Sequence, residues 1–325
     1  MTRTKELIMK PEILQLNPIL VPSINEKLDE LYTVRRYYEQ EDKEAYVREI
    51  GKTIRGVITG GHTGISQALM AQLPSLEIVA VNGVGTDAVD LAYARERRIP
   101  VTGTFGALTE DVADMAIGLL IAACRNISTV DRFVRQGMWP KYPQPGAIPL
   151  ARRFSDMDVG VVGMGRVGRA VAIRASAFGC KIRYTDLQQI EGLPYEFVGE
   201  LKQLAEQSDV LVLCAAADKA EGIINAEILN ALGEGGYLVN VARGRLVKED
   251  DLVEALQSGR IAGAGLDVFV DEPHVPKALL EMDNVVLQAH RASATMESRT
   301  AMGEMVLSSL ADALAGRRVE NSLTT

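Results

Sequence analysis

The chain has 325 residues, of which 47% are hydrophobic and 24% charged, and its formal net charge is -8. This length is about twice that of a usual single domain, so it favours two domains with a cleft between them. The near-average composition excludes disorder, collagen-like repeats and coiled coil, and the negative charge argues against nucleic-acid binding.

Compartment is indicated by the termini and the cysteines. Met1 to Pro11 mixes charged residues with a short apolar run, so no signal-peptide core is expected there. No apolar stretch reaches about 18 residues without a polar interruption, which predicts no membrane span. The three cysteines have no paired spacing, so neither a disulfide framework nor a zinc site is expected. These features together predict a cytoplasmic protein.

The first hundred residues are typical of an α/β unit. Charged residues at helical spacing over 39–49 predict the solvated face of a helix, and another helix is expected to run through Arg97. Strands are expected at 13–21, 56–59, 76–81 and 100–102.

The middle of the chain contains the most apolar predicted helix, 110–126, for which Thr109 is the expected N-cap. A helix that is hydrophobic nearly all round must be buried on several sides, as between domains or subunits. The following segment, 137–150, carries four prolines and the single tryptophan, Trp139, so it is expected to be irregular.

Strands and helices alternate regularly after Asp156. Six strands separated by helices indicate a doubly wound parallel sheet, and 293–315 is expected to be a final long helix. The predicted strands are 159–162, 181–185, 210–214, 237–241, 261–266 and 285–288.

A buried strand runs into Gly163-Met164-Gly165-Arg166-Val167-Gly168 and then into a helix. In this order the glycines permit a tight turn, close approach of a pyrophosphate and close helix packing, so the segment predicts dinucleotide binding. The next strand ends with Asp186, which can bind a ribose 2′-hydroxyl and would repel a 2′-phosphate. No Lys or Arg lies between Asp186 and Gly199, so NAD(H) is favoured and NADP(H) is left open. The alternative is that Asp186 merely ends its strand.

Three polar residues, Arg243, Asp267 and His290, fall at or just past the ends of predicted parallel strands, the edge where ligands bind in open α/β sheets. An Arg can clamp a carboxylate, and a His held by an acid such as Glu272 can exchange a proton.

At these residues the chain resembles the D-isomer-specific 2-hydroxyacid dehydrogenase family, and within it the hydroxypyruvate, glyoxylate and hydroxyphenylpyruvate reductases. The resemblance covers nearly the whole chain. The matching stretches are Thr109-Glu-Asp-Val-Ala-Asp-Met-Ala-Ile-Gly-Leu-Leu, the glycine motif, Val241-Ala-Arg-Gly, Gly265-Leu-Asp-Val-Phe with Glu272-Pro, and the His290 segment.

The resemblance implies two Rossmann-like domains: a flavodoxin-like substrate domain, 1–109 and 296–325, and an inserted dinucleotide-binding domain, 110–295. It implies that Arg243 binds the carboxylate of a 2-oxoacid and polarises its carbonyl, and that His290, kept protonated by Glu272, donates the proton. The expected cofactor contacts are the six residues 163–168, Asp186, Cys214, Val241, Ala242, Arg243, Asp267 and His290. The expected substrate contacts are Gly60, Gly61, Val84, Gly85, Arg243 and His290, with Trp139 reaching the site of a partner subunit or merely anchoring its loop.

Two positions depart from the reductase pattern. Asp186-Leu187-Gln188 stands where NADPH-dependent members carry a Ser-Arg-Ser type segment, which weakens any transfer of NADPH preference. Arg291 stands beside His290 where relatives commonly have a small residue, so substrate size and charge preferences do not transfer.

The sequence thus predicts a homodimeric reductase that converts a small 2-oxoacid, hydroxypyruvate or glyoxylate, into the D-2-hydroxy acid. The alternatives within the class are a 2-ketogluconate or aryl-pyruvate reductase. Phosphoglycerate dehydrogenase is disfavoured because nothing follows the final helix, and formate dehydrogenase because Glu272 suits proton transfer. A dinucleotide-sensing corepressor or scaffold on the same fold is the alternative from another class.

Overall fold

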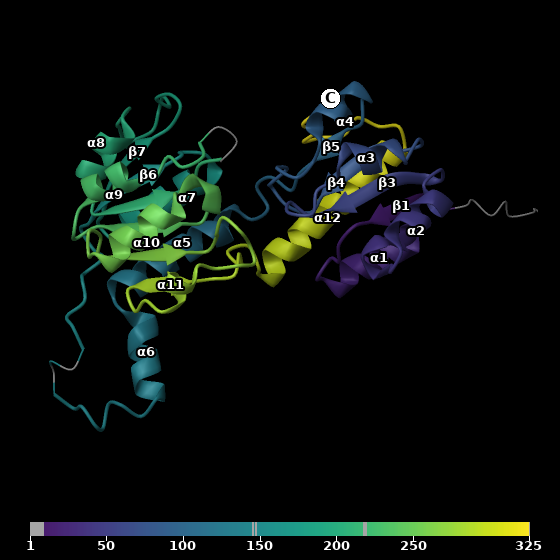
Figure 1. The fold of residues 1–325 in the computed structure, drawn as a ribbon. Helices are drawn as coiled ribbons and strands as arrows, with labels where there is room; N and C mark the ends of the chain where they lie inside the picture. Colours follow the sequence, from purple (N-terminus) through teal and green to yellow (C-terminus); the bar gives the residue numbers. More distant parts are fainter. Residues whose placement is uncertain (1–9, 145, 147, 217–219, 325) are drawn as a thin grey trace, which may run out of the picture. The chain divides into compact units, whose positions relative to one another are not determined.

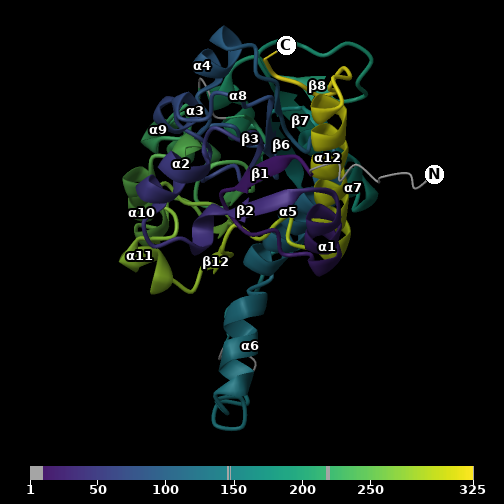
Figure 2. The same cartoon turned by 90° about the vertical axis from the view of Figure 1, so that its right-hand side faces the viewer.

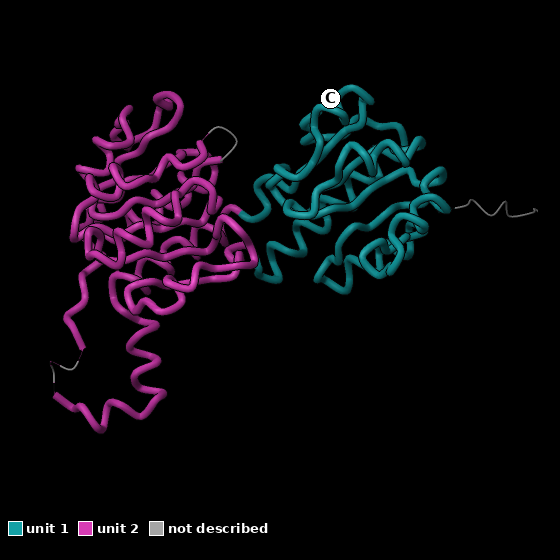
Figure 3. Tube along the Cα trace, viewed as in Figure 1, with its two compact units in different colours: residues 1–108, 294–325 teal, residues 109–293 magenta. Residues whose placement is uncertain are grey.

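The structure, a computed structural model, describes residues 10–144, 146, 148–216 and 220–324. The segment in which no signal-peptide core was expected, Met1 to Pro11, therefore lies mostly outside the described residues. The chain divides into two compact units (Figure 3). Unit 1 comprises Met1–Leu108 and Ala294–Thr325, and unit 2 comprises Thr109–Ser293. Unit 1 is therefore built from both ends of the chain.

Unit 1 contains a five-stranded parallel sheet in the order β2-β1-β3-β4-β5 (Figure 1). This is the flavodoxin-like order, which reverses direction between β1 and β3. Its elements are β1 (Glu12–Gln15), α1 (Pro22–Leu31), β2 (Thr33–Arg36), the 3-10 turn η1 (Tyr37–Glu39), α2 (Lys43–Ile50), β3 (Ile54–Thr59), α3 (Gln67–Ala71), β4 (Ile78–Val81), α4 (Leu91–Glu96), β5 (Val101–Thr102) and α12 (Met296–Leu314).

Alternating side chains of this sheet build two separate cores, because successive residues of a strand point to opposite faces. On one face, strand residues such as Ile13 and Ile58 pack with α1 and with α12, including Leu310. On the other face, residues such as Val57 and Val79 pack with α2, α3 and α4. Unit 1 is thus a three-layer sandwich with helices on both sides.

The strand predicted at 13–21 is wrong in its second half. β1 ends at Gln15, and α1 begins at Pro22. Pro18 lies in the intervening segment, and proline has no backbone N–H to donate to a sheet. Ile19 and Val21 are nevertheless buried, which explains why the segment has a strand-like sequence.

The helix predicted at 39–49 also differs from the structure. α2 begins at Lys43, after Asp42 caps it by accepting a hydrogen bond from the Ala45 amide. Its inner face buries Val47 and Ile50.

Unit 2 contains a seven-stranded parallel sheet in the order β12-β11-β10-β9-β6-β7-β8 (Figure 1). Its elements are α5 (Thr109–Cys124), α6 (Ile127–Arg135), β6 (Asp158–Val162), α7 (Arg166–Ala177), β7 (Lys181–Thr185), β8 (Glu196–Phe197), α8 (Leu201–Glu206), β9 (Val210–Leu213), α9 (Ala226–Leu232), β10 (Tyr237–Asn240), the 3-10 turn η3 (Gly244–Leu246), α10 (Glu249–Gln257), β11 (Gly263–Leu266), α11 (Lys277–Leu280) and β12 (Val285–Leu287).

The order of strands in unit 2 is the doubly wound one, and it reverses between β6 and β9. Helices α8 to α11 pack on one face in a core that includes Leu211 and Leu266. Helices α5 and α7 contact strands of the same sheet and each other. The predicted fold class, α/β with two doubly wound units, is confirmed, although β8 adds a strand that the sequence did not reveal.

The apolar helix α5 is covered within unit 2 itself. It contacts β10, β11, β12 and α7, and Gly265 of β11 lies so close that a Cβ there would meet the Leu119 side chain at 2.9 Å. The sequence led us to expect a helix between domains or subunits, but the sheet and α7 already account for its buried residues. Thr109 is the first residue of the helix rather than its N-cap.

Helix α6 projects from the body of unit 2, and the chain after it runs back toward that body (Figures 1 and 2). No residue of α6 is buried, although the helix carries Ile127 and Val134, both exposed. The described part of 137–150 has no helix or strand apart from short turns, as the four prolines predict.

Within the described residues, we find no individual helix with the length and apolar character needed to cross a membrane. Helices α5 and α6 meet those criteria only as a pair, and the chain bends by 64° at the break between them.

Candidate functional site

The glycine loop between β6 and α7 has the backbone that its sequence predicts. Gly163 has a φ of 91°, and a Cβ there would lie 2.6 Å from the Cα of Ala215. A Cβ on Gly168 would lie 2.1 Å from the carbonyl oxygen of Gly163. Both positions therefore require glycine, the first for its left-handed turn and the second for the contact between helix and loop.

The amino end of α7 suits a bound anion. Gly165 is its N-cap residue, no side chain caps the helix, and no acidic residue lies in the first turn. No atom lies within 4 Å of the place where a Cβ on Gly165 would be. Helix N-terminal amides attract phosphate groups, so Gly165, Arg166 and Val167 fit the pyrophosphate of a dinucleotide.

Asp186 follows β7 and faces this loop. One carboxylate oxygen accepts a hydrogen bond from the Met164 amide at 2.8 Å, and the other accepts one from the Leu187 amide at 2.7 Å. A carboxylate oxygen has two lone pairs, so each retains capacity for a ribose hydroxyl. The acid therefore does more than end a strand, since it ties the glycine loop to the neighbouring strand end.

Cys214 directly follows β9, the strand beside β6, and its amide donates to the carbonyl of Val162 at 2.8 Å. Burial raises the pKa of its thiol to about 12. The thiol is thus protonated at neutral pH, which favours a packing role beside the glycine loop over redox chemistry.

Arg243 lies in the turn after β10, beside the buried Val241 and Ala242. Its guanidinium donates to the Ala242 carbonyl at 2.7 Å. The next residue, Gly244, is packed so tightly that a Cβ there would lie 1.9 Å from the carbonyl carbon of Phe269, in the loop after β11. Glycine thereby brings the loops after β10 and β11 into backbone contact.

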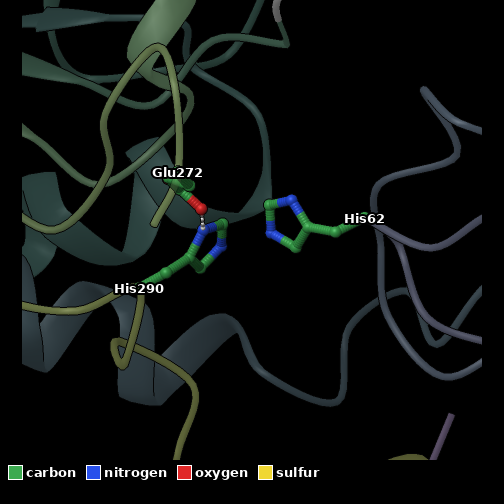
Figure 4. Close-up of side chains that lie close together, drawn as sticks. All are labelled: His62, Glu272 and His290. Carbon is green, nitrogen blue, oxygen red and sulfur yellow. Dashed lines mark hydrogen bonds and ion pairs between the residues drawn. The ribbon is translucent and has the colours of Figure 1, made fainter. Parts of the chain in front are cut away.

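Glu272 and His290 form a hydrogen-bonded acid and imidazole pair (Figure 4). Glu272 Oε2 lies 2.8 Å from His290 Nδ1. The other oxygen, Oε1, accepts a hydrogen bond from the Phe269 amide at 3.0 Å, so the carboxylate is held in place. Both side chains are only partly exposed. A carboxylate bonded to one ring nitrogen orients the imidazole and leaves its other nitrogen, Nε2, for a further partner.

His290 has a left-handed backbone, with a φ of 53°. A non-glycine residue in this region is uncommon and is often held there by its surroundings at functional sites. The surroundings here include Asp267, whose carbonyl accepts a hydrogen bond from the His290 amide at 2.8 Å.

The buried carboxylate of Asp267 also binds the His290 loop. It accepts hydrogen bonds from the Arg291 amide at 2.7 Å and the Ala292 amide at 3.1 Å. The resemblance implied a cofactor contact for Asp267, and sequence reasoning did not reveal these two internal bonds. Its place at a strand end was the available signal, but a strand end does not identify the partner of the side chain.

The expected substrate residues of unit 1 occupy neighbouring loops. Gly60 and Gly61 follow β3, whereas Val84 and Gly85 follow β4. A Cβ on Gly61 would lie 2.9 Å from the Gly85 carbonyl oxygen, so the two loops touch. Trp139 of unit 2, by contrast, is 61% exposed in the segment after α6.

The fold and this site define an α/β protein that has a glycine loop suited to a dinucleotide and a hydrogen-bonded pair of a carboxylate and an imidazole. Residues 117–292 match the family model described as D-isomer specific 2-hydroxyacid dehydrogenase, NAD binding domain. The chain is 44% identical over 302 residues to 2-ketogluconate reductase of Gluconobacter oxydans, covering 93% of this chain and 94% of the relative. It belongs to the D-isomer specific 2-hydroxyacid dehydrogenase family and is an oxidoreductase that uses NAD or NADP.

Two solved structures support this conclusion. A 2-hydroxyacid dehydrogenase from Ketogulonicigenium vulgare has a TM-score of 0.90 and 39% identity, covering 97% of this chain and 99% of that one. An NADPH-dependent glyoxylate/hydroxypyruvate reductase from Sinorhizobium meliloti, in complex with NADP and malonate, has a TM-score of 0.87 and 38% identity, covering 97% of each chain. The predicted family and fold class are confirmed.

Proposed function

We propose that the chain reduces a small 2-oxoacid, hydroxypyruvate or glyoxylate, to the D-2-hydroxy acid. The hydrogen-bonded pair of Glu272 and His290, in the same unit as the glycine loop, is the observation that carries this proposal. The Sinorhizobium meliloti relative is named for these two substrates.

The proposed roles follow from the chemistry of each group. The imidazolium of His290 donates a proton from Nε2 to the carbonyl oxygen, while Glu272 holds Nδ1 and stabilises the positive charge. Arg243 binds the substrate carboxylate, for which its planar fork of N–H donors is suited. In unit 1, the loops that contain Gly60, Gly61, Val84 and Gly85 are proposed to bind substrate through backbone amides.

NADH or NADPH supplies the hydride when bound. For the cofactor we propose the residues predicted from sequence, with two of them playing additional roles: Asp186 also ties the glycine loop, and Asp267 also holds the His290 loop. We propose a preference for NAD(H), because the Asp186 carboxylate would repel a 2′-phosphate and Leu187-Gln188 offers no compensating charge.

A second candidate substrate is 2-ketogluconate. The Gluconobacter oxydans relative is named for it. Arg291 is exposed directly after His290 and presents a charged donor group for the hydroxyls of a sugar-derived substrate.

We also propose a homodimer in which α6 and the chain after it contact a second copy. The exposed apolar side chains in the described part of this projecting segment include Ile127, Val134, Trp139, Tyr142 and Leu150. Exposed apolar groups clustered on one projecting element favour protein contact, and Trp is enriched at interfaces. In such a dimer, Trp139 is proposed to reach the partner's active site.

We propose the cytoplasm as the compartment. Cys124, Cys180 and Cys214 are all free thiols, a state that a reducing environment maintains.

The test of the function is steady-state oxidation of NADH and of NADPH with a panel of 2-oxoacids, run on the wild type and on three variants. We expect turnover of hydroxypyruvate or glyoxylate, and a loss of about 10²- to 10⁴-fold in kcat for His290→Asn, since general acid catalysis contributes that much. Arg243→Ala should mainly raise KM, and Glu272→Gln should lower kcat.

His274→Asn is the matched control, because His274 is exposed and pairs only weakly with Asp271 at 3.6 Å. Equal activity of the His290 and His274 variants would contradict the mechanism. Failure of the wild type to turn over any 2-oxoacid would instead favour the dinucleotide-sensing alternative.

A further inference from the structure

Asn240, the last residue of β10, is 1% exposed, and its side chain forms hydrogen bonds with the backbone of the turn that contains Arg243. Its Nδ2 donates to the Arg243 carbonyl at 2.9 Å, and its Oδ1 accepts from the Ala242 amide at 3.0 Å. Both polar atoms of the amide are thus engaged with the backbone of this turn, and the turn's shape depends on them.

Asp267, the first residue after β11, forms similar hydrogen bonds with the backbone of the turn that contains His290. It is also 1% exposed, and its two carboxylate oxygens accept from the amides of Arg291 and Ala292. Its own carbonyl accepts from the His290 amide. Three hydrogen bonds from one residue therefore hold the backbone around His290 in its left-handed conformation.

These two buried residues are bonded to each other through the sheet. The Asp267 amide donates to the Asn240 carbonyl at 3.0 Å, and β10 and β11 are paired in parallel up to this point. The contact of Gly244 with Phe269 joins the two loops a second time. An unbroken series of backbone and side-chain hydrogen bonds thus connects the Arg243 turn to the His290 turn.

We propose that Asn240 and Asp267 are positioning residues that together fix the placement of Arg243 relative to His290. The inference rests on the proposed function, in which Arg243 binds the carboxylate and His290 protonates the carbonyl of the same small molecule. In a 2-oxoacid these two groups are adjacent, so the two side chains must be held at one spacing. In this role Asn240 and Asp267 act through Arg243 and His290, and Asp267 keeps its proposed contact with the cofactor in addition.

We call the hydrogen bonds that Asn240 and Asp267 make with the two turns the frame. The isosteric variant Asp267→Asn tests the part of the frame that holds the His290 turn. An amide has one acceptor oxygen in place of two, and its NH2 group would face a backbone N–H, so one of the two bonds to the His290 loop is lost. We expect kcat to fall by about 100-fold, the effect of a displacement of about 1 Å at an active site. Because Asp267 is also a proposed cofactor contact, kcat is measured at saturating NADH, where a change in the NADH Kd does not affect it.

Asn240→Ala tests the part of the frame that holds the Arg243 turn. It leaves the Arg243 carbonyl and the Ala242 amide without their side-chain partner, and we expect KM for the 2-oxoacid to rise about tenfold or more as Arg243 is displaced. Because the frame is continuous, the effects of the two substitutions should not add in the double variant. Asn284→Ala is the matched control: Nδ2 of Asn284 donates to the Ala262 carbonyl at 3.3 Å, at the opposite end of β11. It should leave both constants unchanged.

Hydrogen exchange measured by mass spectrometry gives a readout that does not depend on turnover. Asp267→Asn should reduce protection at residues 291 and 292, whose amides bind its side chain. Asn240→Ala should reduce protection at 242 and also at 291 and 292. Unchanged exchange in these segments would overturn the proposal whether or not the protein is active. A weakened NADH Kd with KM and kcat unaltered would overturn it too, since it would make Asp267 a cofactor contact alone. If Arg243→Ala raises KM for the 2-oxoacid as proposed while Asn240→Ala behaves like Asn284→Ala, the proposed function stands and this inference fails.

Discussion

Two acidic residues of this protein, Asp186 and Glu272, each bond to the backbone nearby in addition to the role expected from their sequence position. Asp186 can face a ribose while it ties the glycine loop to β7 through the Met164 amide. Glu272 holds His290 with one oxygen and the Phe269 amide with the other. Such double use means that a substitution at either acid alters the backbone nearby as well as the chemistry.

Asp186→Ser is expected to shift the cofactor preference. It removes charge-assisted hydrogen bonds, each worth about 1.5–3 kcal/mol, so the NADH KM should rise by about tenfold or more. Repulsion of a 2′-phosphate disappears at the same time, and the ratio of kcat/KM for NADPH to that for NADH should increase. Initial rates with both cofactors measure the ratio. Glu191→Ser, an exposed acid in the following loop, is the control, and an equal shift there would show that only general charge matters.

At this scale the sequence predicted the catalytic candidates but not what holds them. Arg243, Glu272 and His290 occur in recognisable motifs, and the structure joins the last two directly. Asn240 and Asp267 were unpredictable as positioning residues, because Asn and Asp at a strand end can bond to many partners. Only the three-dimensional placement of the two turns identifies those partners.

Among the elements, strands with buried residues were predicted, including the two-residue β5, whereas the polar edge strands β2 and β8 were not. β2 reads Thr-Val-Arg-Arg, and its arginines are balanced by ion pairs with Glu12 and Asp29, so the segment lacks a strand-like pattern. β8 has only two residues. Both lie at edges of their sheets, where pairing on one side lets polar sequences form strands.

The contact between α7 and the glycine loop makes Gly168 sensitive to the smallest substitution. Gly168→Ala places a Cβ 2.1 Å from the Gly163 carbonyl oxygen, so helix and loop must separate. We expect a loss of about 1–3 kcal/mol in the free energy of unfolding, the usual cost of overpacking, together with weaker NADH binding. Urea unfolding and a fluorescence titration with NADH measure the two effects.

Gly118→Ala is the matched control for this experiment. Gly118 lies in α5 with no atom within 4 Å of its would-be Cβ. Because alanine favours a helix by about 1 kcal/mol over glycine, this variant should be slightly more stable with unchanged NADH binding. Equal destabilisation of both variants would contradict the packing argument.

For the whole molecule, the doubly wound sheet of unit 2 was predictable because strands and helices alternate regularly after Asp156. The pattern of unit 1 predicted only an α/β unit, and its flavodoxin-like fold was expected from the family resemblance. The projecting helix α6 was not predictable, because the apolar helix before it and the proline-rich segment after it dominate the pattern. The covering of α5 within unit 2 also changes the basis of the proposed dimer, which now rests on α6 and the chain that follows it.

Val134→Glu is expected to convert the proposed dimer into a monomer, because it places a charge among the exposed apolar side chains of the projecting segment. Sedimentation velocity measures the change, and activity should fall with it if Trp139 serves the partner's site. Leu280→Glu, on the exposed face of α11, is the control and should leave the mass in solution unchanged. A wild type that sediments as a monomer would refute the dimer.

The division of unit 1 between the two ends of the chain has a consequence for biosynthesis. α12 supplies Val306, Leu307 and Leu310 to the core over Ile13 and Ile58, and Leu323 bonds to Val101. When residues 1–293 have left the ribosome, all of unit 2 has been synthesised. The face of the unit 1 sheet that contains Ile13 and Ile58 is then still without α12, which packs against it in the folded protein. Unit 2 can complete its fold while the chain is still being made, but the first unit to be started is the last to be finished.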